Sequence, residues 1–88
     1  MHTRKIIESQ HRAQHDNVLN IWTVYDHPKD FPHSFVARRF EVRGPFPVVT
    51  DDIVQGELEI IRESFRQAGL VKLMRNDDDD PKIVESWI

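Results

Sequence analysis

The feature that most constrains this chain is a run of eight residues, 18–25, that has no polar face. In an extended strand, successive side chains point to opposite faces of the sheet. One face would carry Ile21, Thr23 and Tyr25, and the other would carry Trp22 and Val24. This pattern is typical of a central strand that is covered on both sides, or of a strand whose second face is covered partly by another copy of the protein.

A stiff connection and a second strand follow this run. Pro28 and Pro32 fix their own φ angles and push the residue before each of them toward extended geometry. Residues 34–43 then alternate as a strand, but Arg38 falls on the face that is otherwise apolar. Either a β-bulge re-aims Arg38 or a buried carboxylate pairs with it, and we favour the bulge. The prolines within 44–47 end the strand, and Val48 and Val49 can add a short edge strand.

One amphipathic helix is expected after residue 50. Thr50, Asp51 and Asp52 offer oxygen atoms that could cap its first turn, although Gly56 weakens that turn and the firm part can begin at Glu57. The stripe expected to face the core is Leu58, Ile61, Phe65 and Ala68. Gly69 suits the left-handed conformation that commonly ends a helix.

These elements predict an α+β fold. We expect an antiparallel sheet of about four strands, with further strands at 70–75 and 83–88, and one amphipathic helix packed on one face. Residues 1–17 form a polar N-terminal arm, either mobile or a weakly docked helix, because they offer no apolar stripe. Residues 18–88 form a single domain, since 88 residues leave room for one core.

Composition narrows the classes of function. The chain has no cysteine, which excludes disulfides, thiolate catalysis and cysteine-based zinc sites. No segment has the apolar length of a signal peptide or a bilayer-spanning helix, so we expect a cytoplasmic protein that does not enter a membrane. The net charge of −3 and the scattered basic residues make nucleic acid an unlikely partner.

The connection between the first two strands, residues 26–33, is the polar segment that stands out. His27, Asp30 and His33 are the candidate catalytic residues, because a histidine and a carboxylate on a rigid loop can exchange protons with a substrate. Asp26, His27 and His33 are the candidate ligands of a divalent metal. The simpler interpretation, which we favour, is that Asp26 and Asp30 hydrogen-bond to the amides of their own turn.

Three further patterns have a structural reading that we prefer. His11 and His15 share a helical face but lack a third ligand. The acidic run 76–80 lacks the glycine and the distal glutamate of a calcium loop, so we read it as a solvated turn. Arg38 and Arg39 are candidate ligands for an anion, and could form a phosphate-binding surface with Arg43, Lys72 and Arg75, as in single-strand-binding domains.

The patterns IWTVYDHP at 21–28 and DDPKIVESW at 79–87 resemble those of small bacterial proteins that are usually called hypothetical. Shorter elements at 30–32 and 35–38 share the resemblance, which covers about residues 20–88. It implies that the loop at 26–33 and the C-terminal strand belong to one unit. It implies no activity, cofactor or catalytic residue.

The leading expectation for function is a non-enzymatic interaction module without a cofactor. It would form a homodimer or bind another protein through a sheet edge or the exposed part of an apolar strand. The alternatives are a small metal-dependent or acid/base enzyme that uses the loop 26–33, and an accessory protein that binds nucleic acid. Convergence of the basic residues on one face would favour the last of these.

Overall fold

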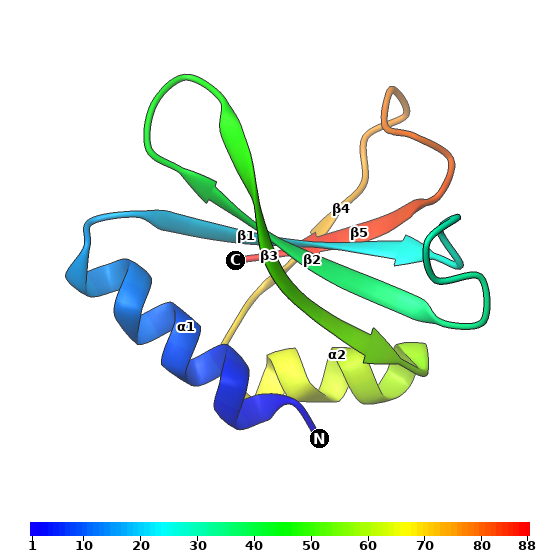
Figure 1. Cartoon of the computed structure of the whole chain (residues 1–88), viewed down its shortest axis with the longest axis horizontal. Coiled ribbons are helices and arrows are strands. Elements are labelled where there is room, and N and C mark those ends of the chain that lie inside the picture. The colour runs from blue at the N-terminus through cyan, green and yellow to red at the C-terminus, as the bar shows by residue number, and fades with distance from the viewer.

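The structure is a computed structural model that describes residues 1–88, and it contains one sheet and two helices (Figure 1). In chain order the elements are α1 (Thr3–His15), β1 (Leu19–Asp26), β2 (Phe35–Val42), β3 (Pro47–Gly56), α2 (Leu58–Gln67), β4 (Lys72–Met74) and β5 (Ile83–Trp87). The strands lie in the order β3-β2-β1-β5-β4, and every neighbouring pair is antiparallel. The predicted α+β class is confirmed, with five strands instead of about four.

β1 is the central strand, as its lack of a polar face predicts. Trp22 and Val24 are fully buried beneath the two helices. Ile21, Thr23 and Tyr25 point to the opposite face, on which no helix lies (Figure 1). The chain itself therefore covers only one of the two faces of β1 with helices.

The core lies between the helices and the sheet and is built around aromatic rings. The ring of Phe65 stacks on that of Trp87 at 5.3 Å between centroids, and lies 5.6 Å from the ring of Trp22. Nine buried residues form this core: Ile6, Trp22, Val24, Ala37, Val54, Ile61, Phe65, Leu70 and Trp87. The expected stripe of α2 is confirmed, since Ile61 and Phe65 are fully buried and Leu58 and Ala68 pack against the core.

The predicted N-terminal caps of α2 are wrong, whereas Gly69 just after this helix has the expected left-handed conformation, with a φ of 84°. Residues 50–56 belong to β3, and α2 begins at Leu58 without a hydrogen bond from a capping side chain. The apolar residues Ile53 and Val54 explain the difference, because they pair with Arg38 and Ala37 of β2 and extend the strand that was expected to be short. Gly56 ends the strand with a positive φ of 148°.

The segment expected to be an arm or a weakly docked helix forms α1. Its Ile6 is fully buried in the core and Ala13 is nearly so. Most of its other contacts with the sheet are polar. Neither helix of the protein is long and apolar enough to cross a bilayer.

The expected β-bulge lies in a different strand. The register between β2 and β3 shifts between Arg38 and Phe40, where five residues of β3, 49–53, stand opposite three of β2. Arg38 itself keeps its place in the alternation of β2. It points to the face without helices and forms an ion pair with Asp30, whose carboxylate is exposed. The prediction that a bulge re-aims Arg38 is therefore wrong, and its partner is not a buried carboxylate.

Candidate functional site

A groove runs across the face of the sheet that carries no helix, which we call the open face. The groove has a volume of about 500 Å³, and its floor and walls come from all five strands. Eleven residues line it: Ile21, Thr23, Tyr25, Phe40, Pro47, Leu73, Met74, Asn76, Asp79, Ile83 and Ser86. In Figure 1 the turn between β2 and β3 stands on one side and the loop between β4 and β5 on the other; Pro47 beside the turn and Asn76 and Asp79 of the loop line the groove.

The floor of this groove is apolar and only partly covered. Ile21, Phe40 and Ile83 are half-buried, and Leu73 on the edge strand is 42% exposed. Ile21 and Phe40 pair directly across β1 and β2, so their side chains form a continuous patch. One hydrogen bond between side chains crosses the floor, between the hydroxyls of Thr23 and Ser86, which lie 3.4 Å apart. The groove therefore offers contact surface more than hydrogen bonds.

Tyr25 lies at the end of the groove nearest the acidic loop. Burial raises the pKa of its phenol, and the negative charges of Asp80 and Asp79 raise it further, while Arg38 acts in the opposite direction. The phenol is therefore neutral at physiological pH and does not act as a base there. Arg38 is occupied by its ion pair with Asp30.

The histidines of the loop 26–33 lie away from this groove, near the N-terminal end of α2. His27 and His33 line a second hollow of about 310 Å³, together with Glu57 and Leu58 at the start of α2. The edge of the His27 ring packs on Phe35, with 4.9 Å between the ring centroids. His27 Nδ1 is hydrogen-bonded to Asp26, which fixes the orientation of the imidazole.

The candidate residues of this loop are thus only partly brought together. The two histidines share one hollow, but Asp30 pairs with Arg38 on the sheet instead. The protein has no group of three His, Asp or Glu side chains arranged to hold a metal ion. The geometry is consistent with proton transfer by His27 or His33, and it offers no set of ligands for a metal.

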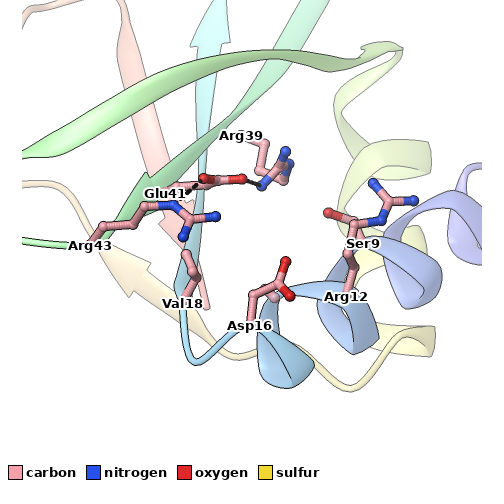
Figure 2. Close-up of a pocket in the computed structure, with 8 residues that line it drawn as sticks. Ser9, Arg12, Asp16, Val18, Arg39, Glu41 and Arg43 are labelled. Carbon is pink, nitrogen blue, oxygen red and sulfur yellow. Dashed lines mark hydrogen bonds and ion pairs between the residues drawn. The ribbon is translucent and has the colours of Figure 1, made fainter.

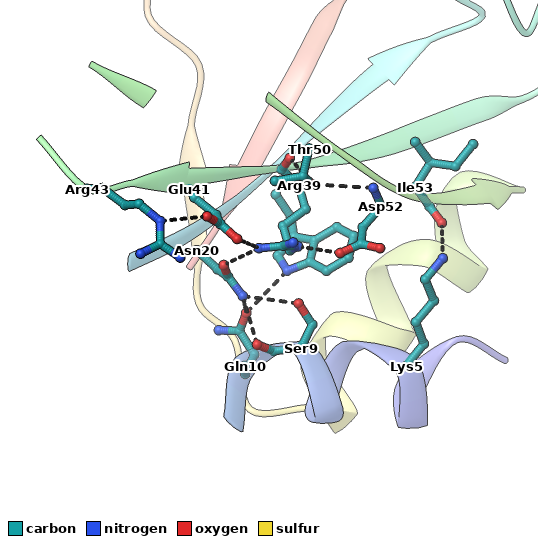
Figure 3. A network of polar contacts seen from close by, with 11 residues as sticks. Lys5, Ser9, Gln10, Asn20, Arg39, Glu41, Arg43, Thr50, Asp52 and Ile53 are labelled. Atoms are coloured by element: carbon teal, nitrogen blue, oxygen red, sulfur yellow. Dashed lines mark hydrogen bonds and ion pairs between the residues drawn. The ribbon is translucent and has the colours of Figure 1, made fainter. Parts of the chain in front are cut away.

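Arg39, the other candidate ligand for an anion, is buried between the sheet and α1 (Figure 3). Its guanidinium donates to Asp52 at 2.7 Å, to Glu41 at 2.9 Å and to Asn20 at 3.0 Å. Burial alone would lower the pKa of Arg39, but the hydrogen bonds to Glu41 and Asp52 outweigh it and raise that pKa. The hydrogen bonds from Arg39 and Arg43 lower the pKa of Glu41.

This network continues into α1. The Asn20 amide donates to Gln10 Oε1 at 2.9 Å and to the backbone oxygen of Ser9 at 3.1 Å, and the Trp22 indole donates to the same Gln10 oxygen at 3.2 Å. No buried side-chain nitrogen or oxygen in the protein lacks a partner. The network is therefore complete in itself and attaches α1 to the sheet.

A small cavity beside the network has polar walls. Arg12 and Asp16 at the C-terminal end of α1 face Glu41 and Arg43 at the end of β2 across it (Figure 2). Its volume is about 10 Å³, which is room for about one water molecule. The cavity is too small for a substrate, so we assign this polar region a structural role.

The remaining predicted patterns also have structural roles. Within the acidic run, Asp79 accepts from the amide of Asn76 and Asp80 accepts from that of Lys82, each at 2.8–2.9 Å. These bonds fix the turn. In the loop 26–33, by contrast, the carboxylates of Asp26 and Asp30 bond to His27 and Arg38, and the favoured prediction that they bond to the amides of their own turn is wrong. The basic residues do not converge, because neighbouring residues Arg38 and Arg39 point to opposite faces of the sheet.

Sequence reasoning did not find the Arg39 network or the pairing of Arg62 with Glu85. One signal was available: Asn20, Arg39 and Glu41 alternate with apolar residues on neighbouring strands, so they share a face. Which of the two faces receives the helices could not be read from that alternation.

Comparison of this chain with protein-family models, with curated proteins and with solved structures gives no match.

Proposed function

We propose that this protein is a non-enzymatic interaction module that self-associates through its open face. The observation that carries the proposal is the apolar groove of about 500 Å³ on a sheet whose helices all lie on the other side. Exposed apolar patches of this kind are typical of contact surfaces between proteins. A second copy of the chain would supply the cover that β1 lacks on this face.

The face is a better contact surface than either edge of the sheet. The edge strand β4 is only three residues long and carries Lys72. The other edge strand, β3, begins with a proline that cannot donate and contains the register shift opposite Arg39. Short strands, lysine, proline and bulges all oppose the addition of another strand. Association through the open face needs no free edge.

The test compares two aliphatic side chains of equal exposure on different surfaces. Leu73 lies on the open face and is 42% exposed, and Ile60 lies on α2 and is 41% exposed. We expect Leu73→Lys to abolish the dimer seen by sedimentation velocity, because the interface would have to desolvate an ammonium group. Ile60→Lys should leave the dimer intact. Equal effects of the two variants, or no dimer in the natural protein, would count against the proposal.

A second candidate function is acid/base catalysis in the hollow of His27 and His33. It is favoured by one observation, that both imidazoles line the same hollow beside Glu57 and that His27 is oriented by Asp26. Native mass spectrometry of untagged protein, purified without chelators, tests it. A retained small molecule that is lost in both His27→Ala and His33→Ala would support this function, and adduct-free protein would oppose it.

A further inference from the structure

The turn between β2 and β3, residues 43–46, ends in an aromatic side chain that the protein itself does not cover. Phe46 is 77% exposed, and it is the only aromatic among the large apolar side chains that are exposed. Pro45 and Pro47 flank it and restrict the backbone on both sides. A rigid, exposed aromatic loses little conformational entropy when it is bound, which suits it to anchor a contact.

The groove on the open face has the dimensions and chemistry to receive such a side chain. Its volume of about 500 Å³ is larger than a benzyl group needs, and Leu73 lies in one wall. Leu73 is 42% exposed and pairs with Ser86, so its side chain lies on the open face and offers an apolar contact to an aromatic ring. Phe46 does not fill the groove of its own chain, because it is 77% exposed and is not among the residues that line the groove.

The two sides of the groove also differ in charge. The loop between β4 and β5 carries Asp77 and Asp78, whose carboxylates have no hydrogen-bond partner in the chain. The turn between β2 and β3 carries Arg43, whose Nε bonds to Glu41 of its own chain at 2.9 Å while its side chain stays 57% exposed. A two-fold axis along the groove would place the turn of each copy against the acidic loop of the other. Opposite charges would then meet twice in one symmetric contact.

We propose that two copies exchange their turns: Phe46 of each copy enters the groove of the other beside Leu73. This inference rests on the proposed self-association and names its contacts. A standard interface removes about 800 Å² from each partner, which is close to one seventh of the 5794 Å² surface of this chain. Contact over the open face alone can therefore bury the area of a standard interface.

The first experiment measures the dimer dissociation constant of two variants. Phe46→Ala removes the proposed anchor, and we expect it to raise the dissociation constant tenfold or more, as roughly expected for a central aromatic. Val48→Ala is the matched control, because Val48 is 59% exposed and pairs with Glu41, whose side chain lies on the helix side of the sheet. We expect this control to leave the dissociation constant unchanged. Circular dichroism and urea unfolding of both variants verify that they fold.

The second experiment uses the absence of cysteine in the chain. We expect a mixture of Pro45→Cys and Leu73→Cys chains to form a disulfide-linked dimer under mild oxidation, because the exchange brings these positions together. A mixture of Pro45→Cys and Ile60→Cys chains should not. A natural dimer that tolerates Phe46→Ala and gives no selective cross-link would overturn the exchange and leave self-association standing. A natural protein that stays monomeric would overturn both.

Discussion

Arg62 on α2 donates hydrogen bonds from Nε and Nη2 to both carboxylate oxygens of Glu85 on β5, at 2.8–3.2 Å. Glu85 is only 3% exposed, and it also accepts a hydrogen bond from the Trp87 indole at 2.8 Å. A buried carboxylate needs such partners because the core cannot solvate its charge. The pair therefore attaches α2 to the sheet at the side of the aromatic core.

Removal of Arg62 should be costly. Arg62→Met leaves the Glu85 charge buried without its main partner, and we expect a loss of about 3 kcal/mol in the free energy of unfolding. Arg66→Met is the matched control, because Arg66 pairs with Glu63 at the surface and should change stability by less than about 1 kcal/mol. Urea unfolding measures both. A cost for Arg62→Met no larger than that of the control would show that Glu85 is not held by this pair.

The same pair predicts a dependence on acid. Burial alone would raise the pKa of Glu85, but the hydrogen bonds from Arg62 and Trp87 outweigh it and lower that pKa in the folded state. The stabilisation that ionised Glu85 contributes is fully present above the pKa of a glutamate in the unfolded chain, about 4.3. It is lost as the pH falls through the lower pKa of Glu85 in the folded state. Glu41, whose pKa is also lowered, adds to this loss.

Urea unfolding at a series of pH values below neutrality measures this dependence. We expect the free energy of unfolding to fall as the pH drops below about 4.3. Glu85→Gln should be less stable at neutral pH and should show a shallower fall in acid. An acid dependence identical to that of the natural protein would contradict the lowered pKa of Glu85.

Helix α1 should contribute to global stability despite its polar sequence. Ile6→Ala removes a fully buried side chain from the core, and we expect it to reduce the free energy of unfolding by about 3 kcal/mol. Ile60→Ala, at a position 41% exposed on α2, is the control for a change of the same chemistry and should cost much less. If Ile6→Ala costs no more than the control, α1 is not part of the cooperative unit.

Tyr25 is the only tyrosine, so its ionisation can be followed by ultraviolet absorbance without interference from another phenol. Burial and the nearby Asp80 and Asp79 raise its pKa, so we expect it to titrate above the ordinary value of about 10. Stability should fall as the pH rises through the folded value, because the unfolded chain releases this proton more readily. Asp79→Asn should lower the pKa. A titration at or below 10 would contradict the environment described for this residue.

The fold could be predicted from the sequence where alternation and helical periodicity were clear. The run 18–25 identified the central strand, and Ile61 and Phe65 identified the core stripe of α2. The capping residues of α2 were mispredicted, because Asp51 and Asp52 resemble caps although pairing with β2 extends β3 past them, whereas the firm start expected at Glu57 agrees with the observed start at Leu58. Local capping signals were overruled there by cross-strand pairing, which depends on residues distant in sequence.

The candidate site was harder to predict for a related reason. The sequence predicted that β1 is covered on both faces, either by its own chain or partly by a second copy, but the alternation of side chains does not say which face the helices occupy. In the structure, α1 lies on the face of Asn20 and Trp22, which donate hydrogen bonds to Ser9 and Gln10 of that helix. The residues of the loop 26–33 attracted attention by their type, and yet Asp30 serves as the partner of Arg38.

The most direct test of self-association through the open face is sedimentation velocity of untagged protein over a wide range of concentration. We predict a species of twice the 10.4 kDa chain mass that dissociates on dilution and is lost in Leu73→Lys but kept in Ile60→Lys. A mass of one chain at every concentration would contradict the proposal and would leave the open face without the cover that we assign to it.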